Sequence, residues 1–150
     1  MKNHNIKVNK IGAEWCVKCH ELEWDNYIDI DKATSEEQNK YQQVFSDYGL
    51  QEMPVITIED DGKVISATDQ CHTKDDALLW STKEIMHYLA KQYNYKESEH
   101  FPKIAAARVR MKLDWNRCPC GGEGRGCISD LCRSEIEKEG HCHCNCFLKK

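Results

Sequence analysis

Ten cysteines are the residues of this 150-residue sequence whose type and spacing best support chemistry. Two of them form a Cys-x-x-Cys pair within the stretch WCVKCH, at Cys16 and Cys19. That spacing serves a redox dithiol, half of a zinc site or, because a histidine follows, the attachment of a c-type haem. Haem attachment needs export and a distal ligand, and the sequence offers neither. Zinc would need two further ligands, which Cys71 and His72 could supply.

A dithiol needs elements that expose one sulfur and hold the other nearby. Residues 6–12 alternate apolar and polar side chains, which predicts a strand, and a helix is expected to open within residues 20–24. Free N–H groups at a helix N-terminus favour a thiolate on the first cysteine. We therefore expect Cys16 to be the nucleophile and Cys19 to resolve the mixed disulfide.

The remaining elements follow from periodicity and turn residues. We expect a strand over 27–31, a helix over 35–49 that starts with Ser35-x-x-Gln38, and a helix over 74–93. Residues 53–66 predict a hairpin that turns at an Asp-Asp-Gly sequence. Its first strand follows Met53-Pro54, where a cis bond would bring the backbone against an active site.

With this element order, residues 5–93 resemble the glutaredoxin/thioredoxin family through the Cys-x-x-Cys pair, Met53-Pro54 and the hairpin. The resemblance implies an α/β thioredoxin-like fold, a central mixed sheet flanked by helices. It also implies that the residue before a cis-Pro54 faces the dithiol and pairs with the substrate backbone. Glutaredoxins carry a Gly-Gly-x-Asp turn that helps hold glutathione, and the matching stretch here, 66–69, keeps only Asp69. Clients such as ribonucleotide reductase are an expectation from the same family.

Seven of the ten cysteines lie between residue 118 and the C-terminus. In a reducing compartment such a density indicates a soft-metal centre better than structural disulfides. Two Cys-x-Cys pairs stand out, because one sulfur of such a pair can bind a cluster while its neighbour stays free beside it. The seven are Cys118, Cys120, Cys127, Cys132, Cys142, Cys144 and Cys146.

The order CPC, two central cysteines, CHC and then Phe147-Leu148 makes residues 100–150 resemble the catalytic subunit of ferredoxin-thioredoxin reductase. The resemblance implies a redox-active disulfide between Cys120 and Cys144, with His143 assisting proton transfer. It further implies a [4Fe-4S] cluster held by four cysteines, Cys118, Cys127, Cys132 and Cys142. A structural zinc site built from four of the seven stays open as the alternative.

Composition sets the organisation and the compartment. We expect a first domain over 1–93, a polar linker over 94–102, and a small, mostly α-helical iron-sulfur domain over 103–150 that opens with a helix over 103–115. No apolar run reaches the roughly 18 residues of a membrane span, and no secretory signal is visible, so we expect a cytoplasmic protein.

Charge is uneven along the chain. Residues 1–75 carry 8 Lys and 15 Asp or Glu, net −7, whereas the remainder is net +3. An overall charge of −4 without an aromatic-studded basic stripe argues against nucleic acid. A basic set is expected to dock an acidic ferredoxin: Arg108, Arg110, Lys112 and Arg117.

Together these patterns predict a ferredoxin-dependent disulfide reductase. Electrons would pass from ferredoxin through the cluster and the Cys120–Cys144 disulfide to the Cys16–Cys19 dithiol, and from there to client disulfides. The alternative is a glutathione-linked glutaredoxin with a zinc-stapled structural or binding module at its C-terminus.

Overall fold

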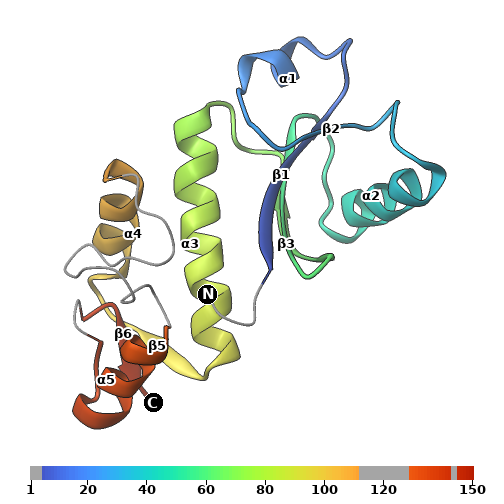
Figure 1. Cartoon of the computed structure of the whole chain (residues 1–150). Coiled ribbons are helices and arrows are strands. Elements are labelled where there is room, and N and C mark those ends of the chain that lie inside the picture. Colours follow the sequence, from blue (N-terminus) through green and yellow to red (C-terminus); the bar gives the residue numbers. More distant parts are fainter. Residues whose placement is uncertain (1–4, 112–128, 143–144) are drawn as a thin grey trace. The chain divides into compact units, whose positions relative to one another are not determined.

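The computed structural model describes residues 5–111, 129–142 and 145–150 (Figure 1). Contacts divide the chain into two compact units, one from Asn5 to Ser81 and one that begins at Thr82. In the described part, no helix combines the length and the apolar character that crossing a membrane requires.

The first unit contains a four-stranded mixed sheet. Its strands are β1 (Ile6–Gly12), β2 (Tyr27–Asp29), β3 (Val55–Asp60) and β4 (Lys63–Thr68), in the order β2-β1-β3-β4. β1 pairs with β2 in parallel and with β3 antiparallel, and β3 pairs antiparallel with β4. The hairpin turns at Asp61 and Gly62, whose φ angles of 52° and 85° fit the left-handed turn that two-residue hairpins prefer. The predicted α/β class with a mixed sheet is confirmed.

Three helices accompany the sheet: α1 (Val17–Glu21), α2 (Ser35–Asp47) and α3 (Lys74–Gln92). The helix cap expected at Ser35 lies one residue earlier. The Thr34 hydroxyl accepts the amide of Glu37 at 3.2 Å and donates to the Glu37 carboxylate at 3.1 Å. The Thr34 hydroxyl therefore caps α2, and Thr34 rather than Ser35 fixes the start of the helix.

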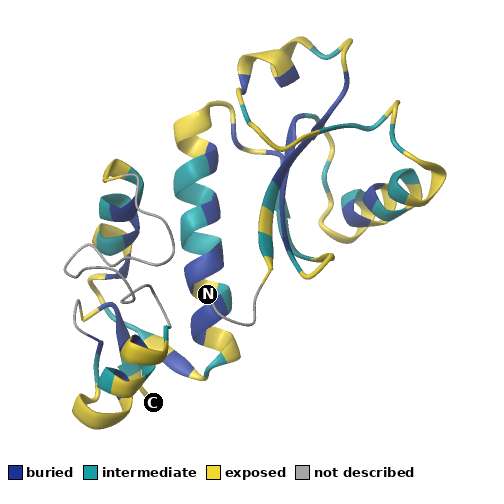
Figure 2. Ribbon diagram, viewed as in Figure 1, coloured by how far each residue is buried: buried dark blue, intermediate teal, exposed yellow. Residues whose placement is uncertain are grey.

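Helices cover both faces of the sheet because side chains alternate along the strands. On one face, Ile56 of β3 packs with Leu22 and with Ala77 from the first turns of α3. On the other, Val55 and Ile11 pack with Tyr41 of α2. All of β3 except its last residue is buried, and Figure 2 shows the contrast with the exposed outer side of α2. The dithiol loop therefore rises from a rigid, two-sided core.

Helix α1 is only five residues long and ends at Glu21. The helix starts earlier than the expected opening within residues 20–24, directly after Cys16, so the first cysteine lies at a helix N-terminus as expected. The chain turns inward because Leu22 is fully buried and Trp24 donates its indole N–H to the Val8 carbonyl at 2.9 Å. Burial of Leu22 and partial burial of Trp24 outweigh continuation of an exposed helix.

The second unit contains the rest of α3, the helices α4 (Phe101–Arg110) and α5 (Asp130–Glu139), and the strands β5 (Tyr95–Glu97) and β6 (Phe147–Lys149). β5 pairs antiparallel with β6. The segment expected to be a linker, 94–102, thus contains a strand with a buried Tyr95 and the start of α4. Among its described residues, the C-terminal region combines helices with a two-stranded sheet.

Aromatic packing and caps hold this unit together. Phe147 is fully buried and meets Phe101 edge-on with ring centroids 6.3 Å apart, and His87 stacks on Phe101 at 4.6 Å. α5 begins at the Ser129 cap and ends at Gly140, whose φ of 83° suits glycine at a helix end. Neither end of α5 was expected from the sequence.

Candidate active site

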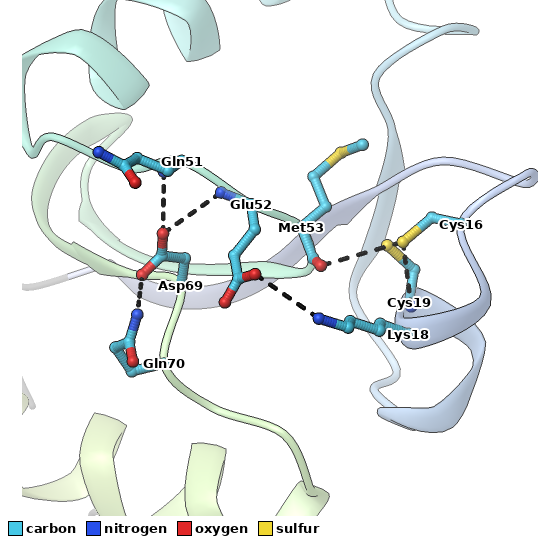
Figure 3. Close-up of polar contacts among 8 residues, drawn as sticks. All are labelled: Cys16, Lys18, Cys19, Gln51, Glu52, Met53, Asp69 and Gln70. Carbon is cyan, nitrogen blue, oxygen red and sulfur yellow. Dashed lines mark hydrogen bonds and ion pairs between the residues drawn. The ribbon is translucent and has the colours of Figure 1, made fainter.

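Cys16 and Cys19 lie at the two ends of one helical turn (Figure 3). Cys16 caps α1, and its Sγ accepts the backbone N–H of Cys19 at 3.3 Å. Cys16 is half-buried, whereas Cys19 is only 1% exposed, and both are free thiols. An outside disulfide can therefore reach only the first sulfur, which is the arrangement that a nucleophile and a resolving thiol need.

Burial sets the behaviour of the second thiol. Loss of solvent, followed by the hydrogen bond with Cys16, raises the pKa of Cys19 to about 11. Cys19 consequently stays a protonated thiol at neutral pH. Only a thiolate attacks a disulfide, so this protonation disfavours Cys19 as a first attacking sulfur.

Alkylation tests this asymmetry directly. With iodoacetamide at about pH 7.5, Cys16 of the reduced chain is expected to react at least about tenfold faster than Cys19, because Cys19 is both buried and protonated. Peptide mapping by mass spectrometry measures the two rates. The same experiment in urea is the control, where the two rates are expected to converge; equal rates in the native protein would contradict the assignment.

Lys10 is a functional candidate that the sequence reasoning missed. Its side chain is 7% exposed, and its Nζ donates to the carbonyls of Cys19 and Leu22, each at 2.7 Å. Burial lowers the pKa of Lys10, while charge on Cys19 and then Cys16 acts in the opposite direction. The Lys10 amine thus donates hydrogen bonds to carbonyl groups at the C-terminal end of α1.

The signal for Lys10 lies in the alternation of β1. Ile6, Val8 and Lys10 share one face of the strand, and Val8 packs against the Leu22 cluster on that face. A lysine on the same strand face as core residues must either be buried or extend its side chain to the surface. Its burial marks it as a residue with a specific partner.

Gly12 allows α1 to approach β1 closely. A Cβ built on Gly12 would lie 2.7 Å from the Sγ of Cys19 and 3.3 Å from the Tyr27 ring. Real contacts are not that short, so any larger residue would displace the Cys19 sulfur. Glycine at this position is a requirement of the dithiol's placement.

The segment before Pro54 forms the opposite wall of the site. The Met53–Pro54 bond is cis, as the sequence analysis considered, and the Met53 carbonyl lies 3.9 Å from Cys16 Sγ. Glu52 reaches Lys18 of α1 at 3.6 Å, which ties this segment to the dithiol helix (Figure 3). Pro54 itself is buried. The structure therefore brings Cys16, Cys19 and Pro54 together, as expected.

Asp69 anchors the same segment from behind. Its carboxylate accepts the backbone N–H groups of Gln51 at 2.9 Å and Glu52 at 3.3 Å and the side-chain amide of Gln70 at 2.6 Å. These bonds, led by that from Gln51, lower the pKa of Asp69, which is 9% exposed. The aspartate that matches the glutathione turn of glutaredoxins is therefore occupied by the chain's own backbone.

Replacing Asp69 with alanine is expected to lower the free energy of unfolding by about 1–3 kcal/mol, because two part-buried backbone donors lose their acceptor. The lowered pKa means that this stabilisation is present above the unfolded value near about 3.9 and is lost as the pH falls through the folded value. Urea unfolding at pH 7 and at low pH measures both effects. Asp25→Ala, at an exposed position, is the control and should change stability by less than about 0.5 kcal/mol.

A groove of about 590 Å³ opens beside Cys16. Its apolar walls are Trp15, Ile30, Phe45, Leu50 and Met53. Its polar lining is Asp31, Gln42, Gln51 and Glu52. The residues on either side of Cys16 are also exposed and apolar, since Trp15 and Val17 are 69% and 71% exposed. Exposed apolar side chains around a reactive sulfur are typical of a surface that contacts another polypeptide.

Cys71 and His72, considered as zinc ligands with the dithiol, do not join it. Cys71 is buried in the core cluster with Leu22 and Ile56, and burial raises its pKa to about 11. Within residues 5–111, 129–142 and 145–150, no three His, Cys, Asp or Glu side chains converge on a point that could hold a metal ion. Cys71 is a core thiol.

Three cysteines of the tail are described, and all are buried: Cys132 on α5, Cys142 and Cys146. The Sγ of Cys142 accepts the backbone N–H of Cys146 at 3.2 Å and that of Phe147 at 3.3 Å. Two N–H donors aimed at one sulfur stabilise negative charge on it, which is what a metal-ligating thiolate needs. The other predicted tail residues lie outside the described residues: Cys118, Cys120, Cys127, His143 and Cys144.

The basic set expected to dock a ferredoxin is only partly supported. Arg108 is 3% exposed, so it is wrong as a docking residue; the apolar side of α4 faces inward with Phe101 and Ala105, and Arg108 lies on that side. Arg110 is exposed. Lys112 and Arg117 lie outside the described residues.

Neither a scan of protein-family models nor a search among curated proteins finds a match to this chain. The geometry of the site is that of a half-buried Cys16 thiol backed by a buried Cys19 thiol.

Proposed function

We propose that the chain is a thiol–disulfide oxidoreductase whose Cys16–Cys19 dithiol reduces the disulfides of client proteins. The observation that carries this proposal is the pair itself, a half-exposed Cys16 beside a buried Cys19 with its pKa raised to about 11. The sheet order β2-β1-β3-β4 further supports a thioredoxin-like fold for the first unit.

The reaction proceeds in two exchanges. The Cys16 thiolate attacks one sulfur of the client disulfide, which forms a mixed disulfide and releases one client thiolate. Cys19 then gives up its proton and attacks Cys16 Sγ; the Cys16–Cys19 disulfide forms and the second client thiol leaves. Two electrons pass from the dithiol to the client, so the chain ends oxidised and needs a donor.

For that donor we propose a [4Fe-4S] centre in the cysteine-rich tail, which would supply single electrons from a ferredoxin-type protein and re-reduce the dithiol through Cys120 and Cys144. Two of its expected ligands are described, and they suit the role: Cys132 and Cys142 are both buried, and Cys142 receives two N–H donors. Cys118 and Cys127 would complete the set. A zinc site would draw on the same donors.

Metal content of anaerobically purified protein tests the proposed centre. We expect about four iron atoms per chain, and Cys142→Ala is expected to lose at least about half of that iron because a ligand is removed. Atomic absorption measures both. Cys71→Ala removes a buried cysteine of the other unit and should keep the iron; a colourless protein that carries zinc instead would contradict the cluster.

A further inference from the structure

We propose that the groove beside Cys16 selects client disulfides flanked by a basic residue and discriminates against glutathione. This rests on the proposed function and names its substrate class. The groove and all of its lining residues belong to the first unit.

The charge of the groove is the first argument. Asp31 and Glu52 are the two carboxylates that line it, and none of the described residues that line it is Lys, Arg or His. Asp31 accepts the indole N–H of Trp15 at 2.7 Å, and this neutral donor leaves the negative charge in place. The groove therefore presents negative charge next to the attacking sulfur.

Neighbouring lysines do not reverse that charge. Lys18 pairs with Glu52 at 3.6 Å and Lys32 pairs with Glu14 at 3.1 Å. The side chains of both pairs are largely exposed, from 45% to 69%. Exposed pairs of this kind contribute little and are readily exchanged, so an incoming cation can replace Lys18 at Glu52.

The walls supply the second argument. A lysine or arginine of a client can lay its methylene stem along Trp15 and Phe45 and still bring its charged head to Asp31 or Glu52. Glutathione carries two carboxylates and one ammonium group, so its net charge is negative. In the groove it would place its carboxylates against those of Asp31 and Glu52. Repulsion between the carboxylates of glutathione and those of the groove slows the association rate and weakens binding.

Single-turnover kinetics test the proposal on the full chain, reduced beforehand. Two matched peptides, each with one internal disulfide, differ only in the flanking residues, Lys in one and Glu in the other; oxidised glutathione is the third substrate. At about 20 mM salt we expect the Lys peptide to react about tenfold faster than the Glu peptide or glutathione, and the ratio should approach one near about 500 mM.

Charge-neutral variants locate the effect. In the double variant Asp31→Asn/Glu52→Gln we expect the preference at low salt to fall below about twofold. Glu36→Gln/Asp75→Asn makes the same change in net charge at exposed positions outside the groove and should keep the preference. Loss of the preference in this control would assign it to net charge and overturn the proposal.

The remaining outcomes distinguish the selectivity of the groove from the activity of the dithiol. Equal rates for both peptides, or faster reduction of the Glu peptide or of glutathione, would overturn the groove's selectivity and leave the dithiol function intact. No reduction of any substrate by the parent chain, at a rate above that of Cys16→Ser, would overturn the proposed function and this inference with it.

Discussion

Replacing Cys16 with serine is expected to lower the rate at which the reduced chain reduces a protein disulfide by at least about 1000-fold. Cys16 is the sulfur that a client can reach, and a serine hydroxyl is not ionised at neutral pH. The companion variant Cys19→Ser keeps the attacking thiol but cannot resolve the intermediate. It should accumulate a mixed disulfide with the client, which intact-mass spectrometry detects.

Cys71→Ala is the matched control, because Cys71 is a buried thiol in the same unit that contacts the core and not the groove. Its activity should stay within about threefold of the parent once circular dichroism shows that it is folded. Full activity in Cys16→Ser would place the client-reducing thiol elsewhere in the chain, and the Cys16–Cys19 assignment would then be wrong.

Replacing Lys10 with methionine is expected to lower the free energy of unfolding by about 2–4 kcal/mol, since two hydrogen bonds from a charged donor are lost. Methionine keeps the length and the apolar stem, so packing changes little. The carbonyls of Cys19 and Leu22 lose the donor that closes α1. We expect the resolving step to slow by about tenfold and the first attack to change by less than about threefold. The reason is that, of the two cysteines, Cys19 is the one whose backbone Lys10 hydrogen-bonds.

Urea unfolding gives the stability, and rapid mixing with mass detection separates mixed-disulfide formation from its resolution. Lys7→Met is the control: Lys7 is on the same strand but exposed, and its loss should cost less than about 0.5 kcal/mol. One contrary outcome for the stability of Lys10→Met has a clear physical meaning. If Lys10→Met is as stable as the parent, relief from burying a charge equals the value of its two bonds.

Local patterns in the sequence predicted most of the first unit. The alternation of residues 6–12, the Asp-Asp-Gly turn and the apolar face of 35–49 each depend on neighbours within a few positions, and β1, the β3–β4 hairpin and α2 appear accordingly. The dithiol and its link to Pro54 were also expected. These features are determined by short-range periodicity and turn chemistry, which a single sequence is enough to show.

Long-range packing decided what was missed. The expected linker contains β5, which pairs with β6 some fifty residues further along. Arg108 reads as a surface charge by type and is buried by its place on α4. No local pattern reports such partners, because burial depends on what the rest of the chain brings to a side chain.

The sequence by itself determined that this protein has a Cys-x-x-Cys pair, a strand preceded by a proline, and a second, dense group of cysteines. Only the tertiary structure decided which sulfur is reachable, that Lys10 and Gly12 hold the other in place, and that the groove beside them carries two carboxylates. The reason is physical: residue type and spacing fix which chemistry a group can perform. Burial, close approach and neighbouring charge exist only once distant segments have met.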